Sequence, residues 1–364
     1  MVRSPLHDKL IESGAHPGEY QGVETALSFG GPNAEFLALR EACAVYDLGW
    51  RAKIIVTGND RMRWMNGMVT NNIRDLAVNR GNYNFFLNPQ GRILADMNIY
   101  NRGEYLMVDT ARWQVPNVME LFDKFIIMDE VEVTDASDKL AAIAVQGPQA
   151  REVLGKAGLL QSGMGLPELP RPLEIPGLLE INDAVWEGIG FSITRLASDT
   201  AEVYELWMSP ENLGTVWNAL LAAGAHPVGM DALEMFRIWA GIPRYGQDIR
   251  DRDLPQETEQ LQALSFNKGC YVGQEIVERI HARGQVRRTF TGFRVQGGAP
   301  PSGSRILAEA KEVGEITSAA TLPWNGGTQN VALGYIRREA ATPGNVVQAG
   351  EFQASLAAVP FRDL

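Results

Sequence analysis

The sequence is poor in the residues that usually crosslink a protein or bind metal. Its 364 residues include two cysteines, Cys43 and Cys270, and four scattered histidines. Two cysteines are too few for a disulfide framework and indicate a reducing compartment, so we expect a cytoplasmic protein. No spacing of histidine and cysteine matches a zinc site, and we therefore predict no metal ligands.

Long apolar runs and an excess of positive charge are also missing. No stretch of about 18 apolar residues is present, so no segment is expected to span a membrane. The N-terminus lacks the apolar core of a signal peptide. The chain carries 33 Lys and Arg against 44 Asp and Glu, a net charge of −11. Such an acidic chain argues against nucleic acid or a membrane surface as a partner.

The most informative stretch is KGCYVGQE, residues 268–275, which contains one of the two cysteines. Apolar residues at helical spacing follow it, and Gly284 is expected to end that helix. Cys270 should therefore lie in a turn just before a helix N-terminus, where the helix dipole and Lys268 both favour a thiolate. The alternative is a buried, unreactive cysteine, and the residues alone leave both interpretations open.

Strand, helix and turn signals predict an α+β protein. Residues 52–135 follow the order β-α-β-β-β-α-β, which is similar to a ferredoxin-like unit. Residues 140–240 indicate a second α+β unit. From Thr289 onward, short strands alternate with Gly and Pro turns, which predicts a small β-barrel.

Several stretches together resemble the YgfZ family, whose members bind tetrahydrofolate and support iron–sulfur cluster assembly and repair. That family shares its fold with the glycine-cleavage T-protein, an aminomethyltransferase. KGCYVGQE is the most specific of the matching motifs. The other matching stretches are YDLGWRAKIIVTG (46–58), MVTNN (68–72), NPQGRI (88–93), AVQGPQA (144–150), AGIPRYGQDI (240–249), LPQETEQ (254–260) and VALGYIRRE (331–339).

The resemblance implies a ring of three domains around a central opening, with folate bound there and the KGCYVGQE loop facing it. We accordingly expect a discontinuous α+β unit of residues 1–51 and 137–245 and a ferredoxin-like unit of residues 52–136. Residues 246–288 would form the motif loop and a connecting helix, and residues 289–364 the β-barrel.

The resemblance also implies binding residues for tetrahydrofolate or a derivative. Glu205 lies in VYELWM, which resembles the T-protein strand carrying the pterin-recognising glutamate; a carboxylate can accept two parallel N–H bonds from that edge. The alternative is a solvent-facing strand residue. Tyr83 aligns with an aromatic residue beside the folate, or is a cross-strand packing residue. Arg237 either binds folate or holds a domain interface. Lys268 and Tyr271 complete the expected folate-binding set.

Two residues are candidates for chemistry, Cys270 and Asp96. The T-protein has an acidic pair where this chain reads Ala95-Asp96, so one carboxylate is missing. The motif cysteine favours a folate-binding factor for iron–sulfur client or assembly proteins, whereas Asp96 keeps a folate-dependent aminomethyl or methyl transferase open. A folate-binding module with a structural cysteine is a third possibility.

A cationic run stands out against the net negative charge. Solvated side chains on a helix face are the default interpretation, but Arg279 and Arg283 are four residues apart and Glu275 balances only the first. The run is therefore also a candidate for binding an anionic folate tail or an acidic client surface. Its members are Arg279, His281, Arg283, Arg287 and Arg288.

Overall fold

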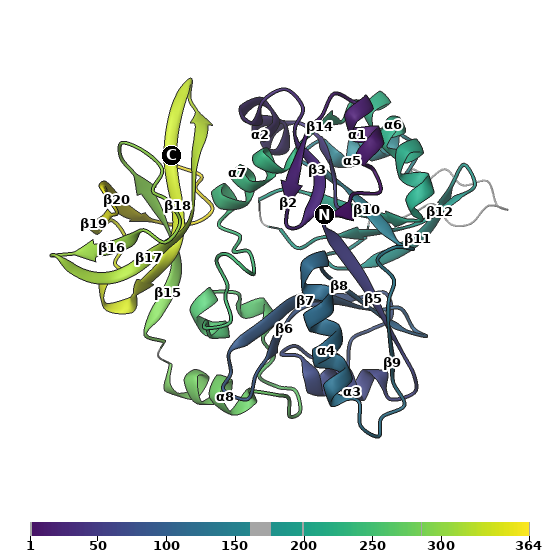
Figure 1. Cartoon of the computed structure of the whole chain (residues 1–364), viewed down its shortest axis with the longest axis horizontal. Helices are drawn as coiled ribbons and strands as arrows, with labels where there is room; N and C mark the ends of the chain where they lie inside the picture. The colour runs from purple at the N-terminus through teal and green to yellow at the C-terminus, as the bar shows by residue number, and fades with distance from the viewer. Residues whose placement is uncertain (1, 161–175, 199, 285, 364) are drawn as a thin grey trace. The chain divides into compact units, whose positions relative to one another are not determined.

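The computed structural model describes residues 2–160, 176–198, 200–284 and 286–363, which fold into two compact units. The first unit contains Met1–Trp64, Ile73–Asn82 and Met97–Leu233. The second contains Met65–Asn72, Tyr83–Asp96 and Glu234–Leu364. Each unit is thus built from segments that are distant in the sequence, as the colours of Figure 1 show.

The first unit is centred on a six-stranded sheet of order β11-β12-β13-β10-β4-β14. Its inner strands β10 and β13 are buried along their whole length, which explains why AAIAVQ and VYELWM are almost continuously apolar. The strands are β4 (Ala44–Asp47), β10 (Ala141–Gln146), β11 (Ile181–Trp186), β12 (Ile189–Arg195), β13 (Val203–Met208) and β14 (His226–Pro227). This unit also contains the helices α1 (His7–Glu12), α2 (Pro32–Glu41), α5 (Ala150–Lys156) and α6 (Leu213–Ala222).

Two further sheets complete the α+β part of the chain. A small N-terminal sheet has the order β1-β3-β2, and a five-stranded sheet has the order β6-β7-β8-β5-β9. The first comprises β1 (Val2–Arg3), β2 (His16–Tyr20) and β3 (Val23–Ser28). The second comprises β5 (Arg51–Thr57), β6 (Gly81–Leu87), β7 (Ile93–Asn101), β8 (Leu106–Ala111) and β9 (Glu132–Asp135), with helices α3 (Arg61–Met68) and α4 (Val115–Phe125). The β-α-β-β-β-α-β order expected for residues 52–135 is found.

A closed barrel of order β15-β18-β17-β16-β19-β20 forms the C-terminal part of the second unit (Figure 1). Its longest hairpin turns at Asn325 and Gly326, both with positive φ, as a two-residue Asn-Gly turn requires. The strands are β15 (Arg288–Val295), β16 (Arg305–Ala308), β17 (Lys311–Trp324), β18 (Gly327–Arg337), β19 (Val346–Ala349) and β20 (Phe352–Ala357). The expected α+β class and terminal barrel are confirmed.

Two helices precede the barrel, α7 (Met230–Ala240) and α8 (Gln274–Arg283). Short 3-10 turns, η3 (Pro255–Thr258) and η4 (Leu261–Ala263), lie between them, and η5 (Arg338–Ala340) follows β18. Within the described residues, none of the helices has the length and apolar character needed to cross a membrane.

Candidate functional site

The Cys270 thiol belongs to an exposed loop that leads into helix α8. The helix begins after Gly273, which adopts the left-handed conformation with φ of 81°. A Cβ atom at Gly273 would lie 2.5 Å from the carbonyl oxygen of Asn88, so only glycine fits there. The position expected from the sequence, a turn before a helix N-terminus, is the one observed, and the alternative of a buried Cys270 is wrong.

The ammonium of Lys268 holds this loop against residues 66–71. Its Nζ donates hydrogen bonds of 2.6 Å to each of three backbone carbonyls, those of Asn66, Val69 and Asn71. The same Nζ lies 4.8 Å from the ring centre of Tyr271. Burial lowers the pKa of Lys268 to about 7, but three carbonyl acceptors require the three N–H groups that only the protonated form has. We therefore assign the charged form at neutral pH, and the three carbonyls account for all of its donors.

Tyr271 also holds the loop, because it packs into an apolar cluster of the second unit. Its ring is buried, and its hydroxyl has no hydrogen-bond partner among the described residues. The cluster also contains Val277 of α8 and Phe85 of β6, and Tyr83 and Phe266 pack against it. The loop that carries the thiol is therefore seated on apolar packing as well as on the Lys268 hydrogen bonds.

The retained carboxylate, Asp96, accepts a 2.8 Å hydrogen bond from the hydroxyl of Tyr83. Both residues are half-buried, whereas Ala95 is completely buried because strand residues alternate between the two faces of a sheet. Ala95 therefore supplies no carboxylate beside Asp96, and its side chain faces the other side of strand β7. Tyr83 and Asp96 form one polar pair.

Glu205 lies at the centre of the six-stranded sheet, on β13, and is 4% exposed. Its neighbours Tyr204 and Leu206 face the main core of the first unit, so Glu205 and Trp207 share the opposite face. The indole N–H of Trp207 donates a 2.8 Å hydrogen bond to Oε2 of Glu205. No described residue donates to Oε1. The alternative of a solvent-facing Glu205 is wrong.

Three further charged residues surround Glu205, and the sequence reasoning missed all of them. Lys53 donates a 2.6 Å bond to Oδ1 of Asp109 and lies 4.3 Å from the ring centre of Trp207. Arg51 donates from Nε, at 3.2 Å, and from Nη2 to the same carboxylate. The signal in the sequence was a lysine inside the otherwise apolar strand AKIIVTG, where it is 1% exposed.

The charges of this cluster shift the pKa values of its two carboxyls in opposite directions. Burial alone would raise the pKa of Asp109, but Arg51 and Lys53 outweigh it and lower that pKa to about 2. Burial and the charge of Asp109 raise the pKa of Glu205, although Lys53 and Arg51 act against them. Glu205 therefore contributes most to stability below its unfolded pKa, and this contribution is lost as pH rises through the raised folded value.

Arg237 of α7 is buried inside the second unit. Its guanidinium donates to both carboxylate oxygens of Glu234, to the carbonyl of Ile242, to Asp248 at 2.6 Å and to the Ser318 hydroxyl at 3.0 Å. These bonds occupy all three nitrogens of the guanidinium. Of the two roles that the sequence left open, this geometry favours holding helix α7, the following loop and barrel strand β17 together.

The chain belongs to the GCVT N-terminal domain family, whose model matches residues 6–268. Aminomethyltransferases of Thermus thermophilus and Geobacillus kaustophilus are 28% and 26% identical, and each match covers 99% of this chain and 99% and 98% of the relative. The glycine cleavage system aminomethyltransferase T from Bartonella henselae shares the fold, with a TM-score of 0.85 at 21% identity over 99% of this chain and 97% of that one.

These matches define the class of protein. The family uses tetrahydrofolate as a cosubstrate, which is the cofactor expected from the sequence. The iron–sulfur role suggested by KGCYVGQE goes beyond what the matches say. In the part of the chain that the structure describes, no three or more His, Cys, Asp or Glu residues are grouped as a metal site.

The two glycines of the motif provide a matched test of the loop geometry. Gly273→Ala should destabilise the protein, because a non-glycine residue with positive φ costs about 1–2 kcal/mol and the Asn88 carbonyl must also move. Gly269→Ala is the control, since a Cβ there meets nothing within 4 Å. Urea unfolding measures both variants. Equal stabilities for the two would contradict the loop conformation.

Proposed function

We propose that this protein binds a reduced folate through Glu205 and supports iron–sulfur cluster assembly or repair with Cys270 as a reactive thiol. The folate proposal rests on the burial of Glu205 and on the incomplete hydrogen bonding of its carboxylate. Its carboxylate is buried, Trp207 fixes one oxygen, and no described residue donates to the other. A pterin edge offers parallel N–H donors, and a charge-assisted bond to a buried carboxylate is stronger than one in water.

Tyr83, Lys268 and Tyr271 remain proposed folate-binding residues because of the family resemblance. The half-buried ring of Tyr83 supports an aromatic contact, since it presents a flat apolar surface. For Lys268 and Tyr271, the contacts support an indirect role, in which they position the loop and do not contact the ligand. Both hold the loop that carries Cys270 and do so without exposing their polar groups.

Cys270 supports the iron–sulfur part of the proposal by its exposure. The other cysteine, Cys43, is completely buried, and burial raises the pKa of its thiol to about 12. Cysteine thiolates are the usual ligands of iron–sulfur clusters, but a cluster takes about four of them. A single exposed thiol therefore suits a transient contact with a cluster or with a client protein that supplies the remaining ligands.

Aminomethyl transfer is the second candidate function. The specific observation in its favour is the hydrogen bond between Tyr83 and Asp96, which keeps one carboxylate of the T-protein pair oriented at the strand surface. The names of the relatives agree with it. A carboxylate held in this way can accept a proton from an amine or stabilise a developing positive charge.

For Glu205, the expected result is a loss of folate affinity. Glu205→Gln should weaken binding of 5-formyltetrahydrofolate by about 1.5–3 kcal/mol, because a charge-assisted hydrogen bond is lost. Wild-type affinity should also fall as pH is lowered toward the raised pKa of Glu205, whereas the Gln variant should lack this dependence. Calorimetry between neutral and mildly acidic pH tests both, with Glu202→Gln as control. Unchanged affinity in Glu205→Gln would remove Glu205 from the site.

The two cysteines should differ sharply in alkylation. In the native protein Cys270 should react rapidly with iodoacetamide while Cys43 reacts only after unfolding, because the thiolate is the reactive species and Cys43 is buried. Cys270→Ser should fold normally yet fail to restore iron–sulfur enzyme activities in cells that lack the protein. Cys43→Ala is the matched control. Full restoration by Cys270→Ser would exclude the thiol from the function.

The transferase candidate rests on Asp96 and is tested by turnover. If the protein transfers an aminomethyl group to tetrahydrofolate, Asp96→Asn should reduce kcat by about 100-fold or more while leaving folate affinity nearly unchanged. Tyr83→Phe, which removes only the hydroxyl, should have a smaller effect. If the wild-type protein shows no turnover with any amine-linked one-carbon donor, the transferase candidate is ruled out. The folate-binding proposal would still stand.

A further inference from the structure

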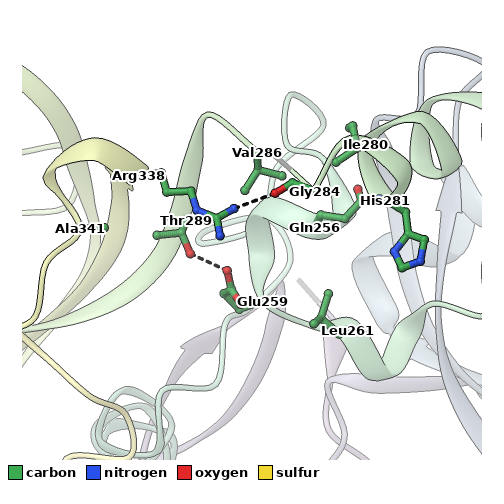
Figure 2. Close-up of a pocket in the computed structure, with 10 residues that line it drawn as sticks. All are labelled: Gln256, Glu259, Leu261, Ile280, His281, Gly284, Val286, Thr289, Arg338 and Ala341. Atoms are coloured by element: carbon green, nitrogen blue, oxygen red, sulfur yellow. Dashed lines mark hydrogen bonds between the residues drawn. The ribbon is translucent and has the colours of Figure 1, made fainter.

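An open pocket of about 510 Å³ lies in the second unit, where helix α8 ends. Figure 2 shows that its walls come from the stretch that contains η3 and η4, from the end of helix α8, from Val286 and Thr289, and from Arg338 and Ala341. Its size falls within the range of roughly 300–1,000 Å³ that is usual for small-molecule sites. The functions proposed above make no use of it.

One wall of the pocket is apolar and accessible. Leu261 is 53% exposed, and Ile280, Val286 and Ala341 are half-buried around it. An exposed leucine at the edge of a concave apolar surface gains free energy when another apolar side chain covers it. This wall suits the insertion of one aliphatic side chain.

The polar wall has an acceptor that needs a donor. The side-chain amide of Gln256 donates a 2.8 Å bond to the carbonyl of Val277, and its own oxygen, Oε1, is buried without a donor among the described residues. Glu259 already accepts a 2.5 Å bond from the hydroxyl of Thr289 (Figure 2).

Four exposed arginines lie at the pocket or next to its lining residues in the chain. Arg338 lies across it and donates a 3.2 Å bond to the carbonyl of Gly284 (Figure 2). Arg283 and Arg287 adjoin the lining residues in the chain, and Arg279 precedes Arg283 by one helical turn. All four arginines are exposed, and within the described residues none of them forms an ion pair. We call these four residues the arginine rim.

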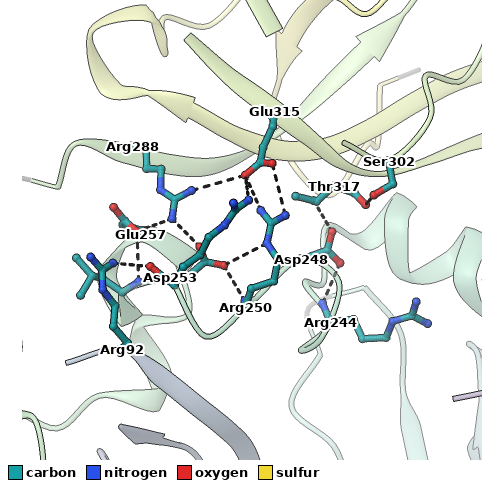
Figure 3. Close-up of polar contacts among 12 residues, drawn as sticks. Arg92, Arg244, Asp248, Arg250, Asp253, Glu257, Arg288, Ser302, Glu315 and Thr317 are labelled. Carbon is teal, nitrogen blue, oxygen red and sulfur yellow. Dashed lines mark hydrogen bonds and ion pairs between the residues drawn. The ribbon is translucent and has the colours of Figure 1, made fainter. Parts of the chain in front are cut away.

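Arg288 does not belong to this rim, although the sequence grouped it with the others. Its guanidinium bonds Asp253 at 2.5 Å and Glu257 at 3.0 Å, and lies 3.8 Å from Glu315 (Figure 3). It also stacks 4.6 Å from the ring centre of Tyr335. This arginine is neutralised inside the fold, so a cationic surface can include only the rim.

We infer that the pocket and its arginine rim dock an acidic segment of a partner protein that inserts one aliphatic side chain. Charge complementarity argues for the acidic segment, because the four rim arginines are exposed and form no ion pair within the described residues. The apolar wall distinguishes a protein from a polyglutamate folate tail, which has nothing to place against Leu261. The ten residues of α8 span roughly 15 Å, so the docked segment would lie about one helix length from the Cys270 loop.

The inference does not depend on folate binding and is tested without it. The probes are two fluorescein-labelled peptides of glutamate, one with a central leucine and one without, and a lysine–leucine peptide of the same length. Fluorescence anisotropy with the full-length protein should show the glutamate–leucine peptide binding best. Its affinity should fall several-fold between about 50 and 300 mM salt, since exposed charges are screened over about 8–10 Å or less.

Variants then separate the two parts of the surface. Arg287→Ala/Arg338→Ala should weaken the glutamate–leucine peptide by about tenfold, as expected for two charged contacts of about 0.7 kcal/mol each. Leu261→Ser should remove the advantage of the leucine and leave the all-glutamate peptide unaffected. Arg151→Ala/Arg305→Ala, which removes two exposed arginines elsewhere, is the matched control and should bind normally.

Two results would overturn the inference. The first is binding of the glutamate–leucine peptide that is no tighter than that of the lysine–leucine peptide, or that is equal in the rim variant and the control. The second is a rim variant that binds both glutamate peptides as wild type does but loses affinity for polyglutamylated tetrahydrofolate relative to the monoglutamate. That second result would identify the occupant as a folate tail.

Discussion

The buried ammonium of Lys268 and the three carbonyls around it are the constraint on which the motif loop depends. A charged group in the interior is tolerated only where hydrogen bonds replace its water, and here residues 66–71 supply all of those bonds. The lysine therefore joins two segments about 200 positions apart in the chain. Because Tyr271 packs beneath the same loop and Gly273 turns it into α8, the exposed position of Cys270 follows from its buried neighbours.

Buried charges in the first unit also need hydrogen bonds or opposite charges, but its two buried carboxyls, Asp109 and Glu205, receive them to different extents. Asp109 receives hydrogen bonds from Lys53, Arg51 and the Asn98 amide, and the charges of Arg51 and Lys53 lower its pKa in spite of its burial. Glu205 in the same cluster receives one bond, from Trp207, and its pKa is raised. The difference marks Asp109 as a carboxylate whose charge the neighbouring cations compensate, and Glu205 as one whose charge they compensate less.

The sequence predicted the features that depend on neighbouring residues. The barrel strands, the order of elements over residues 52–135 and the Cys270 turn all follow from local periodicity and turn residues. Lys53 and Asp109 were missed because each looks like an ordinary strand residue, and their partnership appears only when β5 and β8 pair. The hydrogen bonds of Lys268 could not be predicted either, because its carbonyl partners are distant in the sequence. A charge next to Cys270 in sequence suggested activation of the thiol, whereas the carbonyls that hold it lie elsewhere in the chain.

The cationic run shows that the number of charges in a stretch of sequence does not predict how many of them remain unpaired at the surface. Arg287 and Arg288 are adjacent and identical in type, yet Arg288 meets Asp253, Glu257 and Glu315 while Arg287 is exposed. Of the carboxylates that neutralise Arg288, Glu257 lies in η3, Asp253 lies two residues before η3, and Glu315 lies on barrel strand β17 (Figure 3). A charge contributes to recognition only to the extent that the fold leaves it unpaired. The surface charge near α8 is therefore a property of the tertiary structure, and the residues that create it include some, such as Arg338, that lie far outside the run.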